Sequence, residues 1–172
     1  MKRLFLLAAL GWASLAPAQP KSDWEVEHEE RDWREAEFKL PAYPKADALI
    51  EFSVSAASRF GFFVDPLSLS VGADGVVRYT LLARSPTGAE TVSYEGIRCK
   101  SGSYRVYAFG YRGAWSQARS EWKPIEPKSV QRWHNELRSR YFCPNRLAIA
   151  TAAEGLDALR RGGHPDTDTT GQ

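Results

Sequence analysis

The chain contains only two cysteines, Cys99 and Cys143, and this pair limits what it can fold into more than any other feature. The first residues, MKRLFLLAALGWASLAPAQP, have a basic start, an apolar stretch from Leu4 to Leu15 and small residues near Ala18, which is the organisation of a secretory signal peptide. We expect residues 1–18 to be removed after Ala18 and the mature protein to be periplasmic. In that oxidising compartment two cysteines have only one possible intramolecular pairing.

A Cys99–Cys143 disulfide closes a loop of roughly 45 residues, which stabilises the fold by about 4 kcal/mol in the chain-entropy model. The alternative is a catalytic or metal-binding pair of thiols, but the chain has neither CxxC spacing nor histidine ligands near the cysteines. No stretch of the sequence approaches the ~20 apolar residues that a membrane-spanning helix requires. We therefore expect a single disulfide-bonded domain that does not span the membrane.

The middle of the chain alternates short β-like stretches with turn residues. The expected strands are residues 49–55, 62–71, 76–85, 90–99 and 104–109. Leu67, Leu69 and Val71 alternate with serines, as in a half-buried strand. Asp74-Gly75 indicates a tight hairpin, because glycine accepts a positive φ angle. Successive strands joined by such turns predict an antiparallel β-meander.

In the strand expected at residues 90–99, the apolar residues switch from even to odd positions along its length. Val92 and Tyr94 share one face, whereas Ile97 and Cys99 share the face of opposite parity. A bulge at Gly96 would return both pairs to the same side of the sheet. We therefore predict a bulge at this glycine.

Near residue 129 the spacing of apolar residues changes to the three or four positions that are typical of a helix. A first helix is expected over residues 129–142, with Ser129 as N-cap and an apolar face of Val130, Trp133, Leu137 and Tyr141. A second is expected over residues 148–161, with a packing face of Ile149, Ala152, Ala153, Leu156 and Leu159. The predicted fold class is α+β: an antiparallel β-meander sheet followed by two C-terminal helices packed on it, with one disulfide clamping the first helix to the sheet.

The expected domain covers residues 38–161. It follows an acidic N-terminal arm at residues 19–37 and precedes a polar tail at residues 162–172, which we expect to be disordered. Residues 21–40 carry eight acidic and four basic side chains, whereas residues 98–146 carry eleven basic and three acidic ones. The chain as a whole is nearly balanced, which argues against nucleic acid as a partner, but the basic block suits an anionic partner.

No catalytic, metal-binding or cofactor-binding motif is present, so we expect no cofactor and no metal site. His134 flanks the apolar stripe of the first helix, where a structural histidine is a simpler interpretation than a general base. Asp65 and Glu95 lie on predicted strands, yet Asp65 precedes a proline and suits a turn, and Glu95 suits an ion pair with Arg98. A hydrolase that uses His134, Asp65 or Glu95 is the alternative function.

The main hypothesis is a binding surface in the basic block. Arginine suits bidentate contact with phosphate or carboxylate, and the rings of Trp and Tyr offer flat faces to sugars or partner side chains. Arg105, Tyr107 and Phe109 have one parity and are expected on one face of their strand. In the competing interpretation, the tryptophans belong to the core and the acidic arm neutralises part of the basic charge.

We therefore predict a non-enzymatic binding or accessory domain of the cell envelope, with an anionic envelope component or a protein as partner. Nothing in the sequence indicates an oligomeric state. The residues expected to form the binding face are Arg98, Arg105, Tyr107, Arg112, Trp115, Arg119 and Trp122.

Several long stretches resemble a known family. LPAYP, FFVDPLSLSVGADGVVRYTLLARSPTGAETVSYEGIRCKSGSYRVYAFG and YFCP, together with Trp115 and Trp122, are similar to the cryptic neisserial protein-like family of exported Gram-negative proteins. The distinctive parts are DGVVRYTL and YEGIRC. The resemblance implies a small exported domain whose cysteines fall at Cys99 and Cys143, and it implies no particular activity or catalytic residue.

Overall fold

The computed structural model describes residues 31–127 and 131–167. The compact domain begins at Arg34, earlier than the predicted residue 38, and includes the end of the acidic arm. The expected signal peptide, the predicted N-cap Ser129 and residues 168–172 lie outside the described part. The strands and helices are β1 (Ile50–Phe52), β2 (Gly61–Val71), β3 (Val76–Arg84), β4 (Glu90–Arg98), β5 (Ser103–Tyr111), β6 (Ala114–Gln117), β7 (Lys123–Pro124), α2 (Arg132–Glu136), η1 (Leu137–Phe142), η2 (Pro144–Arg146) and α3 (Ala152–Arg161).

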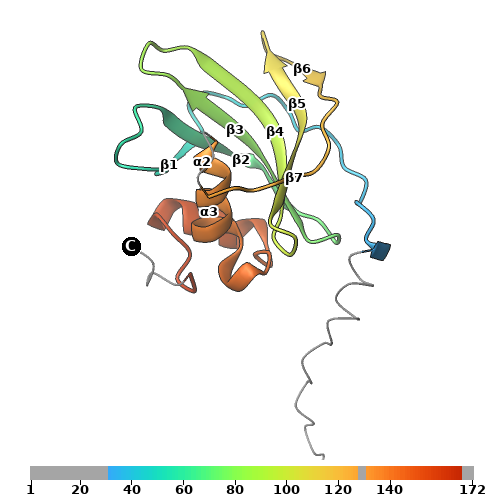
Figure 1. The fold of residues 1–172 in the computed structure, drawn as a ribbon. Coiled ribbons are helices and arrows are strands. Elements are labelled where there is room, and N and C mark those ends of the chain that lie inside the picture. The colour runs from blue at the N-terminus through green and yellow to red at the C-terminus, as the bar shows by residue number, and fades with distance from the viewer. Residues whose placement is uncertain (1–30, 128–130, 168–172) are drawn as a thin grey trace, which may run out of the picture. The chain divides into compact units, whose positions relative to one another are not determined.

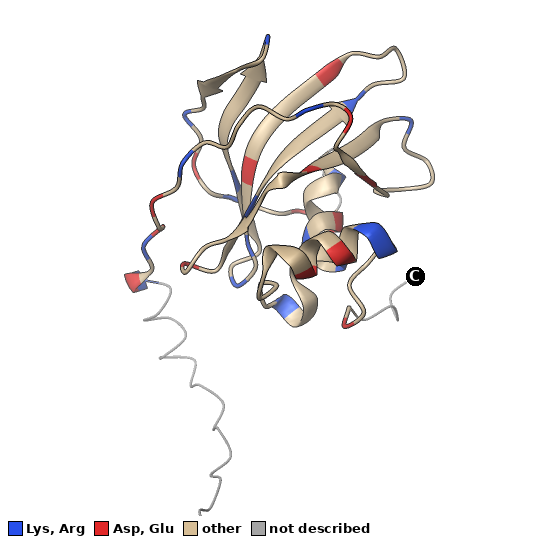
Figure 2. Ribbon diagram, turned by 180° about the vertical axis from the view of Figure 1, so that it is seen from behind, with Lys and Arg blue, Asp and Glu red and all other residues tan. Residues whose placement is uncertain are grey.

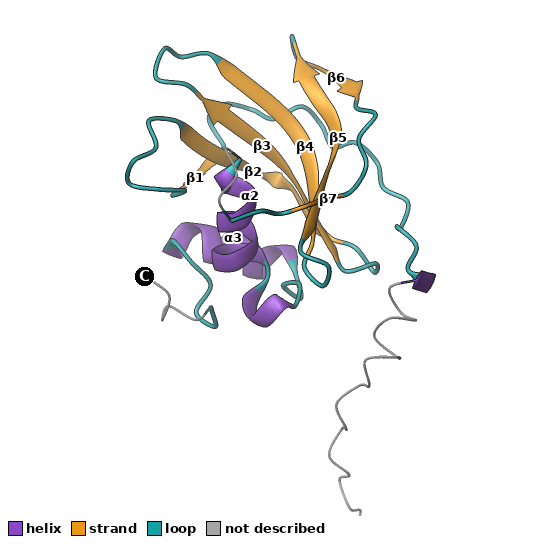
Figure 3. Cartoon of the chain, viewed as in Figure 1, coloured by secondary structure: helices purple, strands orange, loops and turns teal. Residues whose placement is uncertain are grey.

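The strands form one antiparallel sheet in which β1 to β6 each pair with the next strand in sequence (Figure 1). The short β7 pairs with the start of β5. The helical segments follow the strands and pack on one face of the sheet, as Figure 3 shows. The predicted class, an α+β fold with a β-meander followed by two helices, is confirmed. No helix in residues 31–127 or 131–167 is long and apolar enough to cross a membrane.

Strand β4 is regular, without the bulge predicted at Gly96, because its pairing with β3 is continuous along the whole strand. The bulge lies in β5 instead, where Tyr107 is the extra residue between the partners of Tyr94 and Glu95. Gly96 is required for space: a Cβ atom there would lie 2.6 Å from the Tyr107 hydroxyl. The bulge also turns Phe109 to the face opposite Tyr107, so the prediction that the two share a face is wrong.

The parity change along β4 reflects burial of both faces of the sheet. Tyr94 packs against Tyr107 on one face, whereas Ile97 and Cys99 belong to the helix-side core on the other. A strand covered on both sides has no polar face, so apolar residues of both parities are expected. Figure 2, seen from behind, shows the segment that precedes β1 crossing the sheet.

Strand β2 is irregular at Pro66, which has no N–H to donate to the ladder. The pairing with β3 shifts between Asp65 and Ser70. Ser68 fills the gap: its hydroxyl donates to the Asp65 carbonyl and accepts from the Thr80 N–H, each at 2.7 Å. Leu67, which the alternation placed on the buried face with Leu69 and Val71, is 83% exposed, so that prediction is wrong.

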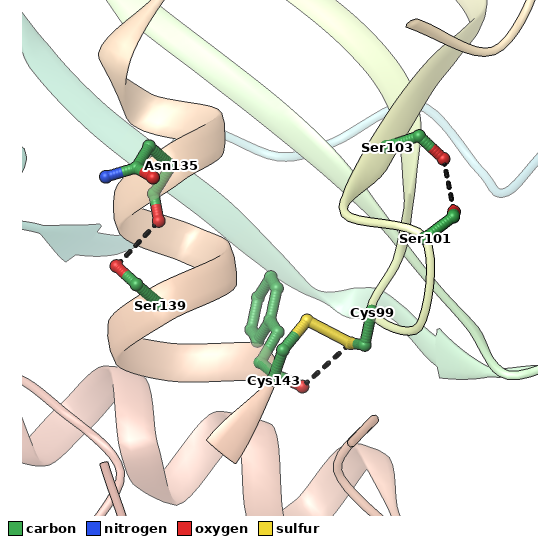
Figure 4. The surroundings of a disulfide bond; sticks show 7 residues. Cys99, Ser101, Ser103, Asn135, Ser139 and Cys143 are labelled. Carbon is green, nitrogen blue, oxygen red and sulfur yellow. Dashed lines mark hydrogen bonds between the residues drawn. A yellow bond between two sulfur atoms is a disulfide. The ribbon is translucent and has the colours of Figure 1, made fainter. Parts of the chain in front are cut away.

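The first predicted helix is α-helical only in α2 and continues as the π-helical segment η1. Cys143 closes this segment by donating its N–H to the carbonyl five residues earlier, that of Arg138, at 3.0 Å. The wider π-turns place three neighbouring side chains in the core, Leu137, Tyr141 and Phe142. The predicted disulfide is confirmed: Cys143 is bonded to Cys99 just after β4, with Cα atoms 5.4 Å apart (Figure 4).

Helix α3 starts at Ala152, later than the predicted residue 148, because Thr151 caps it by accepting from the Glu154 N–H at 3.2 Å. Ala153, predicted on the packing face, is exposed. The first residues of the tail, which we predicted to be disordered from residue 162, are also ordered. His164 is buried; its Nε2 donates to Glu154 at 2.8 Å, and its Nδ1 accepts from the Asp166 N–H at 3.1 Å. Residues 162–167 therefore belong to the folded domain.

Replacing both cysteines, Cys99→Ala with Cys143→Ala, is expected to lower the free energy of unfolding by about 2–5 kcal/mol, because the unfolded chain is no longer closed into a loop. Urea unfolding followed by tryptophan fluorescence measures this difference. Thiol titration of the denatured, non-reduced wild-type protein is expected to find no free thiol. Two free thiols, or a double variant as stable as the wild type, would contradict the prediction.

Candidate functional site

A buried polar network joins the sheet to α2. Glu95 on β4 and His134 on α2 are 3% and 2% exposed, and Oε2 of Glu95 lies 2.9 Å from Nε2 of His134. The same carboxylate accepts hydrogen bonds from the hydroxyls of Tyr79, at 3.0 Å, and Ser93, at 2.6 Å. Tyr104 stacks on the His134 ring with 3.7 Å between centroids. Glu95 therefore has donors from the sheet and from the helix.

Glu95 is ionised in this network. Burial alone would raise the pKa of Glu95, but the contacts with His134, Ser93 and Tyr79 lower it below its ordinary value of 4.5. Burial, and then the neighbouring Glu95 charge, raises the pKa of Tyr79 well above its ordinary value. The tyrosine hydroxyl thus keeps its proton and remains a donor to the carboxylate.

A pocket of about 680 Å³ adjoins this network. Its walls come from the loop between β1 and β2, the helix-side face of β2 to β5, and the start of α2. Phe60, Phe62, Phe109 and Trp133 contribute apolar rings to the walls, and two of them, Phe60 and Phe109, are 50% and 48% exposed. The volume falls within the range of about 300–1,000 Å³ that is typical of small-molecule sites.

The network does not present a general base to this pocket. Nε2 of His134 is engaged by Glu95, and Nδ1 is buried with no hydrogen-bond partner in the described residues. A general base needs its nitrogen within about 2.6–3.2 Å of the proton it takes. Asp65, the third candidate, does not line the pocket and accepts from the Leu67 N–H at 3.1 Å, the turn role expected before a proline. Among residues 31–127 and 131–167, no three His, Cys, Asp or Glu residues are grouped to hold a metal.

The opposite face of the sheet is covered by residues 35–43, which we call the strap. Glu35 is its main anchor. One carboxylate oxygen accepts from Nη1 of Arg105 at 2.6 Å, and the other accepts from the Tyr107 hydroxyl at 2.5 Å. Nε1 of Trp122 and Nη2 of Arg78 lie 3.4 Å from the same carboxylate. A residue of the acidic arm therefore occupies part of the predicted basic and aromatic face.

Aromatic contacts hold the rest of the strap. The ring of Phe38 packs on Tyr107 with 4.2 Å between centroids. Nε1 of Trp115 donates to the Pro41 carbonyl at 2.9 Å, and Tyr43 packs against the same indole at 5.3 Å. Trp115 and Tyr107 are thereby covered by the protein's own chain.

The structure distributes the predicted binding residues over several places. Arg105, Tyr107 and Trp122 meet at Glu35, and Trp115 lies under the strap. Arg98 is buried at the end of β4. Arg112 lies in the turn between β5 and β6, with its guanidinium 5.0 Å from the centre of the Tyr111 ring. Arg119 lines a shallow polar hollow beside Arg105.

Residues 28–160 match the model of the CNP1-like family. The chain belongs to this family. It is also 31% identical over 112 residues to cryptic neisserial protein 1 of Neisseria gonorrhoeae, and the match covers 55% of each chain. The chain thus spans about half the length of that relative. No solved structure is significantly similar to it.

Sequence reasoning found His134 and Glu95 but not the pocket that they adjoin. The parity of β4 contained a usable signal, because Glu95 has the parity of Ile97 and Cys99 and so faces the same core. The assumed bulge at Gly96 concealed this relation and favoured an ion pair with Arg98. The structure gives Glu95 different partners, in His134, Tyr79 and Ser93.

Glu35→Gln is expected to lower the free energy of unfolding by about 1–3 kcal/mol, because Arg105 and Tyr107 lose a charged hydrogen-bond acceptor in a partly buried position. Chemical denaturation at low ionic strength measures the change. Glu37→Gln is the matched control, since Glu37 is exposed and two residues further along the strap. Equal stability of the two variants would show that Glu35 does not anchor the strap.

Glu95→Gln is expected to lower stability at pH 7 by about 3–5 kcal/mol, because it breaks a buried pair. Since the folded-state pKa of Glu95 is depressed, the stability from its charge is fully present above the unfolded-state pKa and is lost as pH falls through the folded-state value. The difference from the wild type should therefore shrink below about pH 4.

Urea unfolding at several pH values between 7 and 3 follows this difference. Glu90→Gln on the same strand serves as the control, because Glu90 is paired with Arg84 at 2.8 Å on the surface. Such an exposed pair contributes about 0–1 kcal/mol. A Glu95→Gln effect that does not change with pH would exclude an ionised Glu95 in the folded protein.

Proposed function

We propose that this protein is an exported periplasmic domain that binds the apolar part of a small molecule in the pocket beside His134 and Glu95. The observation that carries the proposal is a cavity of about 680 Å³ with exposed aromatic side chains in its wall, beside the buried pair of Glu95 and His134. Exposed apolar rings around a concavity favour a ligand that removes them from water. Export is supported by the sequence of residues 1–18 and by the Cys99–Cys143 disulfide.

The hydrolase alternative is less favoured. It requires His134 or Glu95 to reach a substrate, yet the Glu95 carboxylate accepts three hydrogen bonds, Nε2 of His134 is engaged by Glu95, and Nδ1 of His134 is buried. Their arrangement suits a fixed floor better than a proton-transferring pair.

A second candidate function concerns the basic and aromatic face. Arg105, Tyr107 and Trp122 already bind one carboxylate, that of Glu35, so their chemistry suits an acidic envelope component or an acidic protein segment. Such a partner would have to displace Glu35 from the face. The pocket needs no such displacement and is therefore the preferred site.

Titration with the neutral fluorescent probe N-phenyl-1-naphthylamine tests the pocket. Saturable binding to the wild type is expected. Thr91→Phe should weaken it roughly tenfold or more, because Thr91 is exposed on the pocket wall and the phenylalanine ring would fill part of the cavity. Ala153→Phe adds the same ring to the exposed side of α3 and should leave binding unchanged. No saturable binding, or equal binding by both variants, would reject the pocket as a ligand site.

A further inference from the structure

The charged groups around the pocket are separated along its depth. The ionised Glu95 lies at the floor, where it is 3% exposed. Arg59, from the loop between β1 and β2, and Arg132, at the start of α2, also line the pocket and are both exposed. The floor therefore holds a carboxylate already paired with His134, whereas the rim carries two exposed guanidinium groups.

The floor does not suit the anionic group of a ligand. The oxygens of Glu95 are occupied by Tyr79, Ser93 and His134. A negative group of a ligand would lose its own hydration there, beside a carboxylate that is already ionised. The deep part of the pocket thus suits an uncharged, apolar group.

The rim has the opposite property. Within the described residues, neither Arg59 nor Arg132 forms a salt bridge with an acidic side chain. Glu136, one helical turn further along, interacts with Arg132 only through its charge. Exposed guanidinium groups are suited to bidentate contact with a carboxylate. Arg105 on the other face of the sheet differs, because Glu35 already pairs with it.

We propose that the ligand is an anionic amphiphile, with an apolar chain in the pocket and a carboxylate held at the rim by Arg59 and Arg132. The chain would lie between the exposed rings of Phe60 and Phe109, and the two guanidinium groups at the rim would fix the orientation of the molecule. This inference rests on the proposed function, since it requires the pocket to bind an apolar group. It adds the charge and the orientation of the ligand.

Three short amphiphiles that differ only in their head group test the inference: decanoate, decanol and decyltrimethylammonium, each below its micelle-forming concentration. Displacement of N-phenyl-1-naphthylamine measures their affinities. Decanoate is expected to bind most tightly and the cation most weakly, and added salt should reduce the advantage of decanoate.

The double variant Arg59→Gln with Arg132→Gln should weaken decanoate roughly tenfold and leave decanol unchanged, because only the acid uses the guanidinium groups. The control is Arg160→Gln with Arg161→Gln, which makes the same change in net charge on α3, outside the pocket lining. It should bind all three compounds as the wild type does.

The two proposals fail in different ways. If decanol binds as tightly as decanoate, or if both double variants weaken decanoate equally, the pocket stays a binding site and the inference about the anionic head group is wrong. If the probe and all three amphiphiles fail to bind, the pocket is not a ligand site and both proposals are rejected.

Discussion

The helix side of the structure depends on the buried carboxylate of Glu95. A carboxylate removed from water is strongly destabilising unless its oxygens are supplied with donors. Its donors come from three elements: Tyr79 on β3, Ser93 on β4 and His134 on α2. Because all three contacts must be made together, α2 is restricted to one position on the sheet. The disulfide adds a second restraint at the far end of η1, and the pocket therefore has rigid walls on the sheet side and on the α2 side.

The opposite face of β3 and β4 is closed by a second carboxylate in a different way. Glu35 belongs to a strap without regular secondary structure, so side chains rather than a backbone ladder hold it in place. Arg78 beneath it is 3% exposed, pairs with Asp74 at 2.6 Å, and has its guanidinium 5.3 and 5.6 Å from the ring centres of Phe38 and Tyr107. Contacts with Asp74 and Tyr107 outweigh burial and raise the pKa of Arg78, which keeps its charge. Part of the basic block thus serves to fasten the acidic arm.

Local patterns predicted most of the fold. Strand positions followed from alternation and turn residues, and the disulfide followed from having only two cysteines in a chain that we expected to be exported. Errors arose where a residue's role depends on a distant segment. Gly96 makes room for Tyr107, and Gly110 leaves room for Tyr43 of the strap, whose ring atoms would lie 2.8 Å from a Cβ at that glycine. Neither spatial requirement has a signature in the neighbouring sequence.

The candidate site was predictable to a smaller extent, for the same reason. His134 and Glu95 were identified as polar residues on otherwise apolar elements, but their meeting depends on where the helix docks. The pocket is assembled from the loop after β1, the bulged strand β5 and α2, which are far apart in sequence. In particular, the bulge at Tyr107 is what turns Phe109 towards the pocket, and alternation alone places that ring on the other face.

The arginines on the two faces of the sheet differ in whether their charge is already paired within the protein. Sequence composition treats Arg105 and Arg132 alike, since both belong to the basic block. In the folded chain Arg105 has a carboxylate 2.6 Å away, so binding an outside anion there must first break an existing contact. Arg59 and Arg132 lie exposed at the rim of the pocket. Neither forms a salt bridge with an acidic side chain in the described part of the chain, so an anion can pair with them without breaking one. The difference in free energy between these two situations favours the pocket over the basic face as the proposed ligand site.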